Sequence, residues 1–123
     1  MKKYRYRDHA GTTQDSIDRA KKNLYKVGSI YKIRGYIHSD RTHVMIYGCR
    51  GTARFDAFAW GYGGTGPNGL IQLLKSLQAN FDIADSEIQR VLDLRWFGPD
   101  DDRVTNRTLW TINTKHKEQA CAA

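Results

Sequence analysis

Apolar and polar residues recur with two different periods in the first part of the chain. Residues 3–7 alternate tyrosine with lysine or arginine, and this period of two predicts a strand with tyrosines on one face and cations on the other. Ile17, Ala20 and Leu24 recur at helical spacing after two threonines that can cap a helix. We therefore expect a strand and then a helix of about 11 residues that ends near Gly28.

Three further stretches have the alternation and the flanking turn residues of strands, namely 29–38, 43–49 and 53–60. Short polar turns separate these stretches, so an antiparallel meander is the simplest arrangement. In the third stretch, Phe58 and Trp60 are expected opposite Phe55. In the first stretch, the alternation assigns residues to two faces: Ile30, Lys32, Arg34, Tyr36 and His38 on one, and Tyr31, Ile33 and Ile37 on the other.

A stripe of leucines predicts the clearest helix of the chain. Leu70, Leu73, Leu74 and Leu77 repeat at helical spacing. Pro67 suits the first turn of this helix because its missing N–H would have no intrahelical acceptor there. Two more elements follow: a shorter helix that begins near 82–85 and buries Ile88, Val91 and Leu92, and a final strand at 108–113.

Together these elements predict an α+β fold, with an antiparallel sheet of four to six strands and two or three helices packed on one face. The length of 123 residues indicates a single domain, 1–123, with residues 115–123 forming a frayed tail. Such a sheet leaves an edge or a face free, so a homodimer or a higher homo-oligomer is expected.

Composition excludes several classes of protein. The hydrophobic fraction of 40% is too high for a disordered chain, and no apolar run approaches the roughly 18 residues of a membrane span. Cys49 and Cys121 do not make a disulfide framework, and Cys49 is expected to be a small buried side chain. We therefore expect a cytoplasmic protein with no membrane partner, located in the bacterial host cytosol if the chain is phage-encoded.

The net charge of +7 is concentrated in one half of the chain. Residues 1–50 carry twelve Lys and Arg against four acids, a net +8, whereas residues 51–123 carry a net −1. Six of the seven tyrosines also lie in the first half. Cations interleaved with aromatic rings suit a nucleotide or single-stranded nucleic acid. The alternative is that strands favour tyrosine and that the cations merely solvate the outer face of a sheet.

Residues 60–70, WGYGGTGPNGL, contain five glycines between a predicted strand and a predicted helix. Glycines at such a junction let successive N–H groups point into one concavity, where the positive end of the helix dipole favours an anion. No Gly-Lys-Ser/Thr follows, and the preceding strands form a meander rather than a βαβ unit, so this is neither a Walker loop nor a dinucleotide fingerprint. The alternative is a tight connection whose glycines only relieve strain.

The string FAWGYGGTGPNGLIQLL resembles the WGYxGxGPxxLAxxLL signature of an uncharacterised family of small bacterial, plasmid and phage domains. The resemblance covers residues 50–78, and Ile71-Gln72 departs from the small residues usual in that family. The family assigns no chemistry, so it implies no catalytic residues. In composition, the chain is also similar in kind to phage proteins that sequester cyclic nucleotide immune signals, such as the Thoeris anti-defence sponges.

The first functional hypothesis is a non-enzymatic protein that sequesters a small phosphorylated nucleotide of the cyclic nucleotide or cyclic ADP-ribose type. Loop amides would hold the pyrophosphate, arginines would pair with phosphates, and aromatic rings would stack on the base. The candidate ligand-binding residues are Trp60, Tyr62, Gly63, Gly64, Thr65, Gly66, Asn68, Arg34, Arg54 and Arg95. The second hypothesis is a single-stranded nucleic-acid-binding module that uses the basic N-terminal half. The third is a protein decoy that binds a defence protein directly.

No catalytic residues, metal ligands or cofactors are expected. The serines lack a GxSxG setting, and the four histidines are scattered, although His38 and His43 flank a predicted turn and could face one another. Residues 100–102 are three aspartates without the alternating ligands of a calcium loop. The two leading hypotheses therefore differ in one geometric respect: whether the basic first half lies beside the glycine loop or faces away from it.

Overall fold

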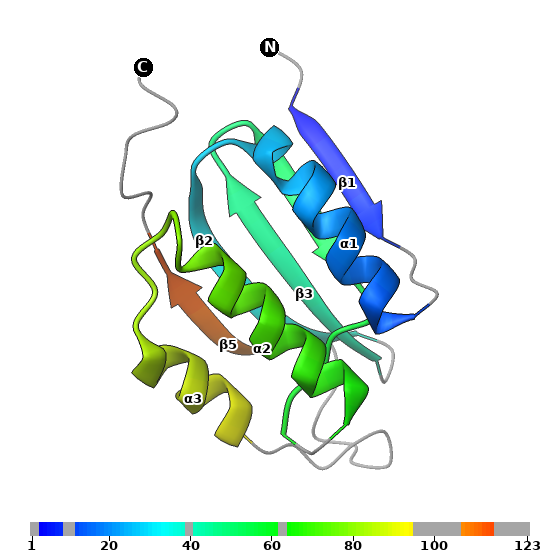
Figure 1. Cartoon of the computed structure of the whole chain (residues 1–123), viewed down its shortest axis with the longest axis vertical. Coiled ribbons are helices and arrows are strands. Elements are labelled where there is room, and N and C mark those ends of the chain that lie inside the picture. Colours follow the sequence, from blue (N-terminus) through cyan, green and yellow to red (C-terminus); the bar gives the residue numbers. More distant parts are fainter. Residues whose placement is uncertain (1–2, 9–11, 39–40, 62–63, 95–106, 115–123) are drawn as a thin grey trace.

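The computed structural model describes residues 3–8, 12–38, 41–61, 64–94 and 107–114 (Figure 1). Along the chain the elements are β1 (Tyr4–Asp8), α1 (Thr13–Asn23), the 3-10 turn η1 (Leu24–Val27), β2 (Ile30–His38), β3 (Arg41–Gly48), β4 (Gly51–Phe55), α2 (Thr65–Leu77), α3 (Asp85–Asp93) and β5 (Arg107–Asn113). The α+β class is therefore confirmed, and each expected helix and strand has a counterpart, although the strand expected at 53–60 ends at Phe55.

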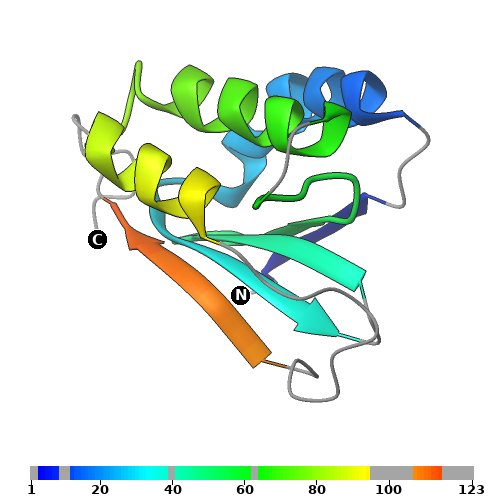
Figure 2. The ribbon, with the colours of Figure 1, turned by 90° about the horizontal axis from the view of Figure 1, so that it is seen from below.

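The five strands form one sheet in the order β1-β4-β3-β2-β5. The meander β2-β3-β4 is antiparallel as expected, and β5 pairs antiparallel with the outer side of β2. The edge strand β1 is the exception, because it pairs parallel with β4. This follows from α1, which crosses over the sheet between β1 and β2 and returns the chain in the same direction. The helices lie together on one side of the sheet (Figure 2).

The core lies between the helices and the sheet. The predicted leucine stripe of α2 faces it, and Leu70, Leu73, Leu74 and Leu77 are all buried. From the sheet, alternate residues such as Ile33 point toward the helices, while their neighbours point away. At about 25 cal/mol per Å² of apolar surface removed from water, this layer is the main source of stability.

Asp8 joins the edge strand to α1 through buried hydrogen bonds. Its carboxylate accepts a bond from the Ser16 hydroxyl at 2.5 Å and bonds from the Arg19 guanidinium. The Tyr6 hydroxyl donates a further bond at 2.8 Å. Burial acts to raise the pKa of Asp8, but the bonds from Arg19, Ser16 and Tyr6 outweigh it, so the pKa lies below its ordinary value.

Two assignments of faces made from alternation are wrong. A bulge in β2 between Ile30 and Lys32 interrupts the period of two, so Ile30 is buried and Tyr31 is exposed. The third strand ends at Phe55, and the chain beyond it is irregular, so Phe58 and Trp60 are buried in the same core as Phe55 rather than opposite to it.

Cys49 also differs from expectation. It lies exposed in the turn between β3 and β4, where its sulfur accepts a hydrogen bond from the Ser29 N–H at 3.0 Å, and it is disulfide-bonded. The expected reducing, cytosolic setting was inferred from two cysteines without a disulfide role, and the bond at Cys49 removes that basis.

Candidate functional site

Trp60 is not available to a ligand. Its side chain has no exposed surface, and its ring meets the ring of Trp110 edge to face, with centroids 5.4 Å apart. A base cannot stack on a ring that is enclosed by the core, so this geometry gives no support to the expected ligand-binding role of Trp60. Trp60 instead anchors the segment that leads from β4 to α2.

The glycine-rich segment leads into the first turn of α2. Gly64 is the N-cap residue, and its carbonyl already accepts a hydrogen bond from the Asn68 N–H at 3.0 Å. Thr65 and the Asn68 side chain are exposed, whereas Gly66 is buried. Three other predicted site residues, Tyr62, Gly63 and Arg95, lie outside the described residues.

Close packing explains one glycine of this segment. A Cβ on Gly69 would collide with the Thr13 side chain of α1 and crowd the ring of Phe58. Gly69 therefore lets α2 approach α1 and the chain after β4, which is a structural use of glycine rather than a ligand site.

Arg34 and Arg54 do not lie beside this segment. Arg34 alternates along β2 with the buried Ile33, and Arg54 alternates along β4 with the buried Ala53. Both arginines therefore point to the side of the sheet away from the helices, whereas α2 lies on the helix side (Figure 2). The structure does not bring Arg34 and Arg54 into one pocket with the described part of the glycine segment.

The side of the sheet turned away from the helices, called the open face below, has its residues in register across all five strands. The central row runs from β1 to β5 through Arg7, Arg54, Met45, Arg34 and Thr111. The next row runs through Arg5, Thr52, Tyr47, Lys32 and Asn113. With strands about 4.8 Å apart, each row is about 19 Å long. Cations thus occur in both rows, from the β1 edge to β2.

Two tyrosine rings meet on the open face beside these cations. Tyr31, turned outward by the bulge, is 52% exposed and lies 6.3 Å from the ring of Tyr47. The ammonium of Lys32 lies 4.3 Å from the centre of the Tyr47 ring, and Arg34 lies 5.8 Å from it. Partial burial raises the pKa of Tyr47 above its ordinary value. Its ring is therefore neutral at physiological pH.

A second stack extends from β3 to β2 and is held by Asp56, which follows the last residue of β4. The His43 ring is buried, its Nδ1 lies 2.6 Å from the Asp56 carboxylate, and it stacks on Tyr36 at 5.0 Å. The Arg34 guanidinium lies over Tyr36 at 4.5 Å. His38 faces the same stack, and the centre of its ring lies 6.4 Å from that of His43. The two histidines were expected to face one another because they flank a predicted turn. Asp56 thus fixes His43, and the stack ends on the Arg34 guanidinium.

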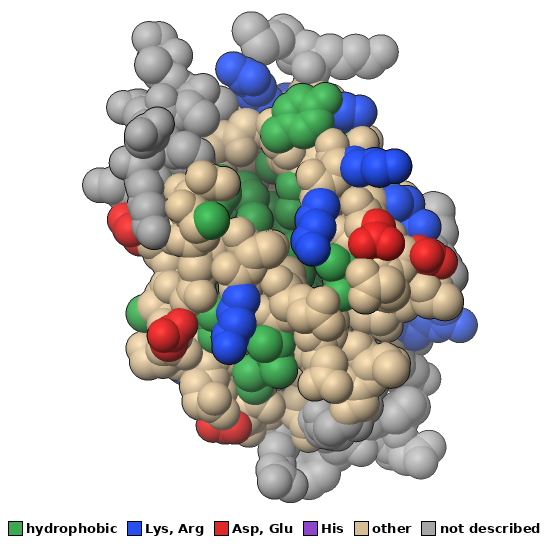
Figure 3. Space-filling view, viewed as in Figure 1, with side chains coloured by type: hydrophobic (Ala, Val, Ile, Leu, Met, Phe, Trp, Pro, Cys, Tyr) green, Lys and Arg blue, Asp and Glu red, His purple; other side chains and the backbone are tan. Residues whose placement is uncertain are grey.

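The open face is strongly basic. Among the described residues, the one carboxylate that pairs with its side chains is Asp56, which lies 3.1 Å from Arg54. In that part of the chain, other cations of the face form no ion pair, among them Arg5, Arg7, Lys32 and Arg34. The helix side differs, because basic and acidic side chains are interspersed there (Figure 3).

Sequence reasoning named Arg34 and Arg54 for a nucleotide ligand, and it assigned Arg5 and Arg7 of the basic N-terminal half to the nucleic-acid alternative. It did not single out Lys32, Tyr31 or Tyr47 as site residues. The signal was present, since residues 3–7 and 29–38 alternate cations with other residues. What was absent was the pairing of strands, which alone puts these residues on one surface.

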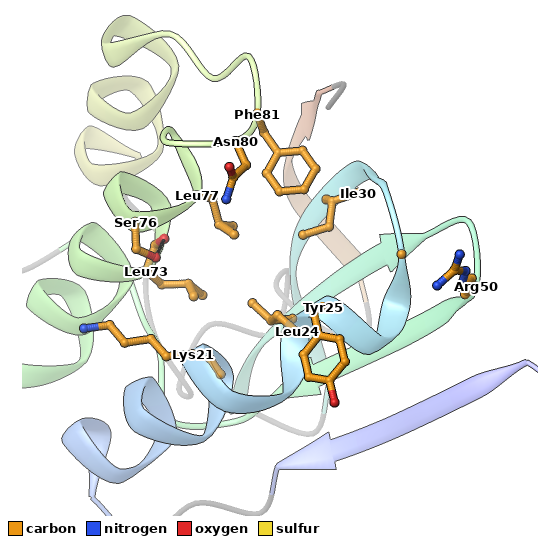
Figure 4. A pocket seen from close by; sticks show the side chains of 12 residues that line it. Lys21, Leu24, Tyr25, Ile30, Arg50, Leu73, Ser76, Leu77, Asn80 and Phe81 are labelled. Carbon is orange, nitrogen blue, oxygen red and sulfur yellow. Dashed lines mark hydrogen bonds between the residues drawn. The ribbon is translucent and has the colours of Figure 1, made fainter. Parts of the chain in front are cut away.

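A cavity of about 360 Å³ opens on the helix side between α1, η1, α2 and the start of β2 (Figure 4). Its centre is apolar, and Lys21 and Arg50 lie at opposite sides of it (Figure 4). None of the ten predicted ligand-binding residues lines the described part of this cavity. Within the described ranges, no three His, Cys, Asp or Glu side chains are grouped so that they could hold a metal ion.

Comparison of the chain with family models, curated proteins and solved structures finds no match. In the part of the chain that the structure describes, no helix is long and apolar enough to cross a membrane. The resemblance over residues 50–78 and the expected homo-oligomer stay predictions.

Proposed function

We propose that this chain binds single-stranded nucleic acid on the open face of its sheet. The observation that carries the proposal is the pair of rings, Tyr31 and Tyr47, set beside the unpaired cations Lys32 and Arg34. Flat rings stack on bases of any sequence, and neighbouring cations follow the phosphate backbone. Arg34 adds a planar guanidinium group, and bases stack on such groups just as they stack on aromatic rings.

The charge pattern supports a polymer rather than a small ligand. The cations lie in two rows and span about 14 Å from β1 to β2 instead of converging on one point. An extended track suits a backbone with a charge at every nucleotide, whereas a compact pyrophosphate needs donors aimed at a single centre.

Sequestration of a small phosphorylated nucleotide by the glycine segment receives less support. That hypothesis needs a stacking Trp60 and arginines close to the loop, but Trp60 is buried and Arg34 and Arg54 lie on the open face. Sequestration is therefore the alternative that the experiment below distinguishes from binding of nucleic acid.

The test is fluorescence anisotropy of labelled single-stranded oligonucleotides at several salt concentrations. The double variant Lys32→Gln/Arg34→Gln removes two phosphate contacts, so the slope of log K against log [salt] should fall in magnitude by about 1.4, at about 0.7 per contact. The control is Lys22→Gln/Lys75→Gln, which removes two exposed lysines from the helix side and should leave the slope unchanged.

Two results contradict the proposal. The first is the absence of oligonucleotide binding, with tight capture of a cyclic nucleotide instead. The second is an equal loss of binding in both double variants, which would indicate attraction by net charge and no defined surface.

A further inference from the structure

A small cavity of about 200 Å³ opens between β2 and the edge strand β5. Its described lining residues are Arg34, Tyr36, Ile37, His38, Arg107 and Thr108. Among these described residues there are two arginines and a histidine but no carboxylate. Within the described residues, neither arginine forms an ion pair.

The cavity depends on an irregularity of the sheet. Trp110 packs directly on Gly35, where any Cβ would collide with the indole ring. Immediately beyond this pair the register of β2 and β5 shifts, so that Tyr36 lies opposite Thr108 and Leu109 is the extra residue. A bulge re-aims the side chains that follow it. Thr108 therefore lies beside Tyr36, and its exposed hydroxyl faces Arg34.

Two contacts hold the Arg34 side chain in place without using all of its N–H donors. Its Nη1 donates to the Thr108 hydroxyl at 3.2 Å, and its guanidinium is stacked on Tyr36 at 4.5 Å. Its Nε is buried and has no hydrogen-bond partner. A buried donor without an acceptor is costly unless an acceptor occupies the site. The position therefore favours an anion with several acceptor oxygens.

We propose that this cavity binds the terminal phosphate monoester of a nucleic-acid strand lying on the open face. This inference rests on the proposed function. A terminal phosphate carries about −1.5 to −2 charges near pH 7 and three acceptor oxygens, against a single charge for an internal phosphodiester. Two arginines match the larger charge, and the His38 ring lies beside them in the lining. The cavity is also smaller than the roughly 300–1,000 Å³ clefts that enclose whole ligands, so it fits an end group.

The experiment compares one oligonucleotide sequence in three forms: with a 5′-phosphate, with a 3′-phosphate, and with hydroxyls at both ends. One phosphorylated form should bind about tenfold more tightly than the hydroxyl form, which corresponds to about 1.4 kcal/mol. The two phosphorylated forms distinguish which end is recognised.

Arg107→Gln and Thr108→Val should reduce this preference to less than about twofold while retaining affinity for the hydroxyl form. Both residues are exposed at the sheet edge, and urea unfolding checks that the variants are folded. The matched control is Arg5→Gln at the opposite edge of the open face, which should weaken all three forms equally and preserve the preference.

Three other results would overturn the inference, and each has a different meaning. Equal affinity for the three forms refutes the phosphate pocket and leaves the proposed function intact. A preference that survives Arg107→Gln and Thr108→Val places the phosphate elsewhere. Failure of all three forms to bind refutes the proposed function and this inference together.

Discussion

The guanidinium carbon of Arg34 lies 4.5 Å from the centre of the Tyr36 ring, two residues further along β2. The other neighbour of Tyr36 is His43, which Asp56 holds in place from the end of β4. The position of Arg34 is therefore determined by contacts that begin two strands away. A long side chain that is held in this way loses less conformational entropy when it binds an anion.

Tyr31 should contribute base stacking. Tyr31→Ala is expected to weaken binding of single-stranded oligonucleotide by about 5- to 150-fold, the equivalent of roughly 1–3 kcal/mol for one stacked base. The matched control is Tyr25→Ala, because Tyr25 is also a strongly exposed tyrosine, at 73%, but lies on the helix side. Anisotropy titrations measure both. Equal effects of the two substitutions would remove Tyr31 from the binding surface.

Asp8 should make stability depend on pH in the acid range. The folded-state pKa of Asp8 lies below its ordinary value of 3.8, so the unfolded chain binds more protons as the pH falls. The stabilisation is present above about pH 4 and is lost as the pH drops through the folded pKa. Asp8→Asn should lower the free energy of unfolding by about 2–3 kcal/mol at pH 7 and by less at pH 3.

Urea unfolding at the two pH values measures this difference. Asp18→Asn is the control, since Asp18 is exposed on α1 and accepts a hydrogen bond from Gln14. That substitution should change stability by less than about 0.5 kcal/mol. If the deficit of Asp8→Asn is the same at both pH values, the carboxylate is not the source of the effect.

A side chain at position 69 should destabilise the protein, because its Cβ would collide with the Cγ2 methyl group of Thr13. Alanine favours a helix by up to about 1 kcal/mol over glycine, but overpacking typically costs about 1–3 kcal/mol. Gly69→Ala is therefore expected to destabilise the protein by about 1–2 kcal/mol. Thr13→Ser removes the Cγ2 that a new Cβ would meet, so the double variant should recover most of the loss. Additive losses in thermal unfolding would contradict this contact.

Trp60 should matter for stability and not for binding. Trp60→Phe loses contact area against Trp110, but it also removes a buried indole N–H that has no hydrogen-bond partner. These effects partly offset each other, so a loss of about 1 kcal/mol is expected in urea unfolding. Affinity for oligonucleotide should stay within about twofold of the native value. A loss of oligonucleotide binding without a loss of stability would show that Trp60 belongs to the binding site.

Most helices and strands of the fold were predictable because their signals are local. Thr12 caps α1 by accepting a hydrogen bond from the Asp15 N–H, and Gly28 ends the following turn at a φ of 81°. Such contacts join residues close in sequence. The faces of β2 were less predictable, because its bulge at Ile30 and Lys32 arises from pairing with β3.

The candidate site was predictable only in its residue types. An excess of cations and tyrosines in the first fifty residues indicated an anionic partner with flat rings. The same residues carried no sign of the side of the sheet on which they would gather. The strongest motif, at residues 60–70, drew the prediction toward a loop whose Trp60 and Gly69 serve packing.

The sequence by itself determined the α+β class, the helices with their buried faces and the approximate positions of the strands, because hydrophobic periodicity and capping act over a few residues. Only the tertiary structure decided that Arg7, Arg54 and Arg34 share one row, and that this row faces away from the glycine segment. Strand order and register join residues far apart in the chain. They therefore decide which of these residues are neighbours. The helices pack on one face of the sheet and leave the other face to the cations.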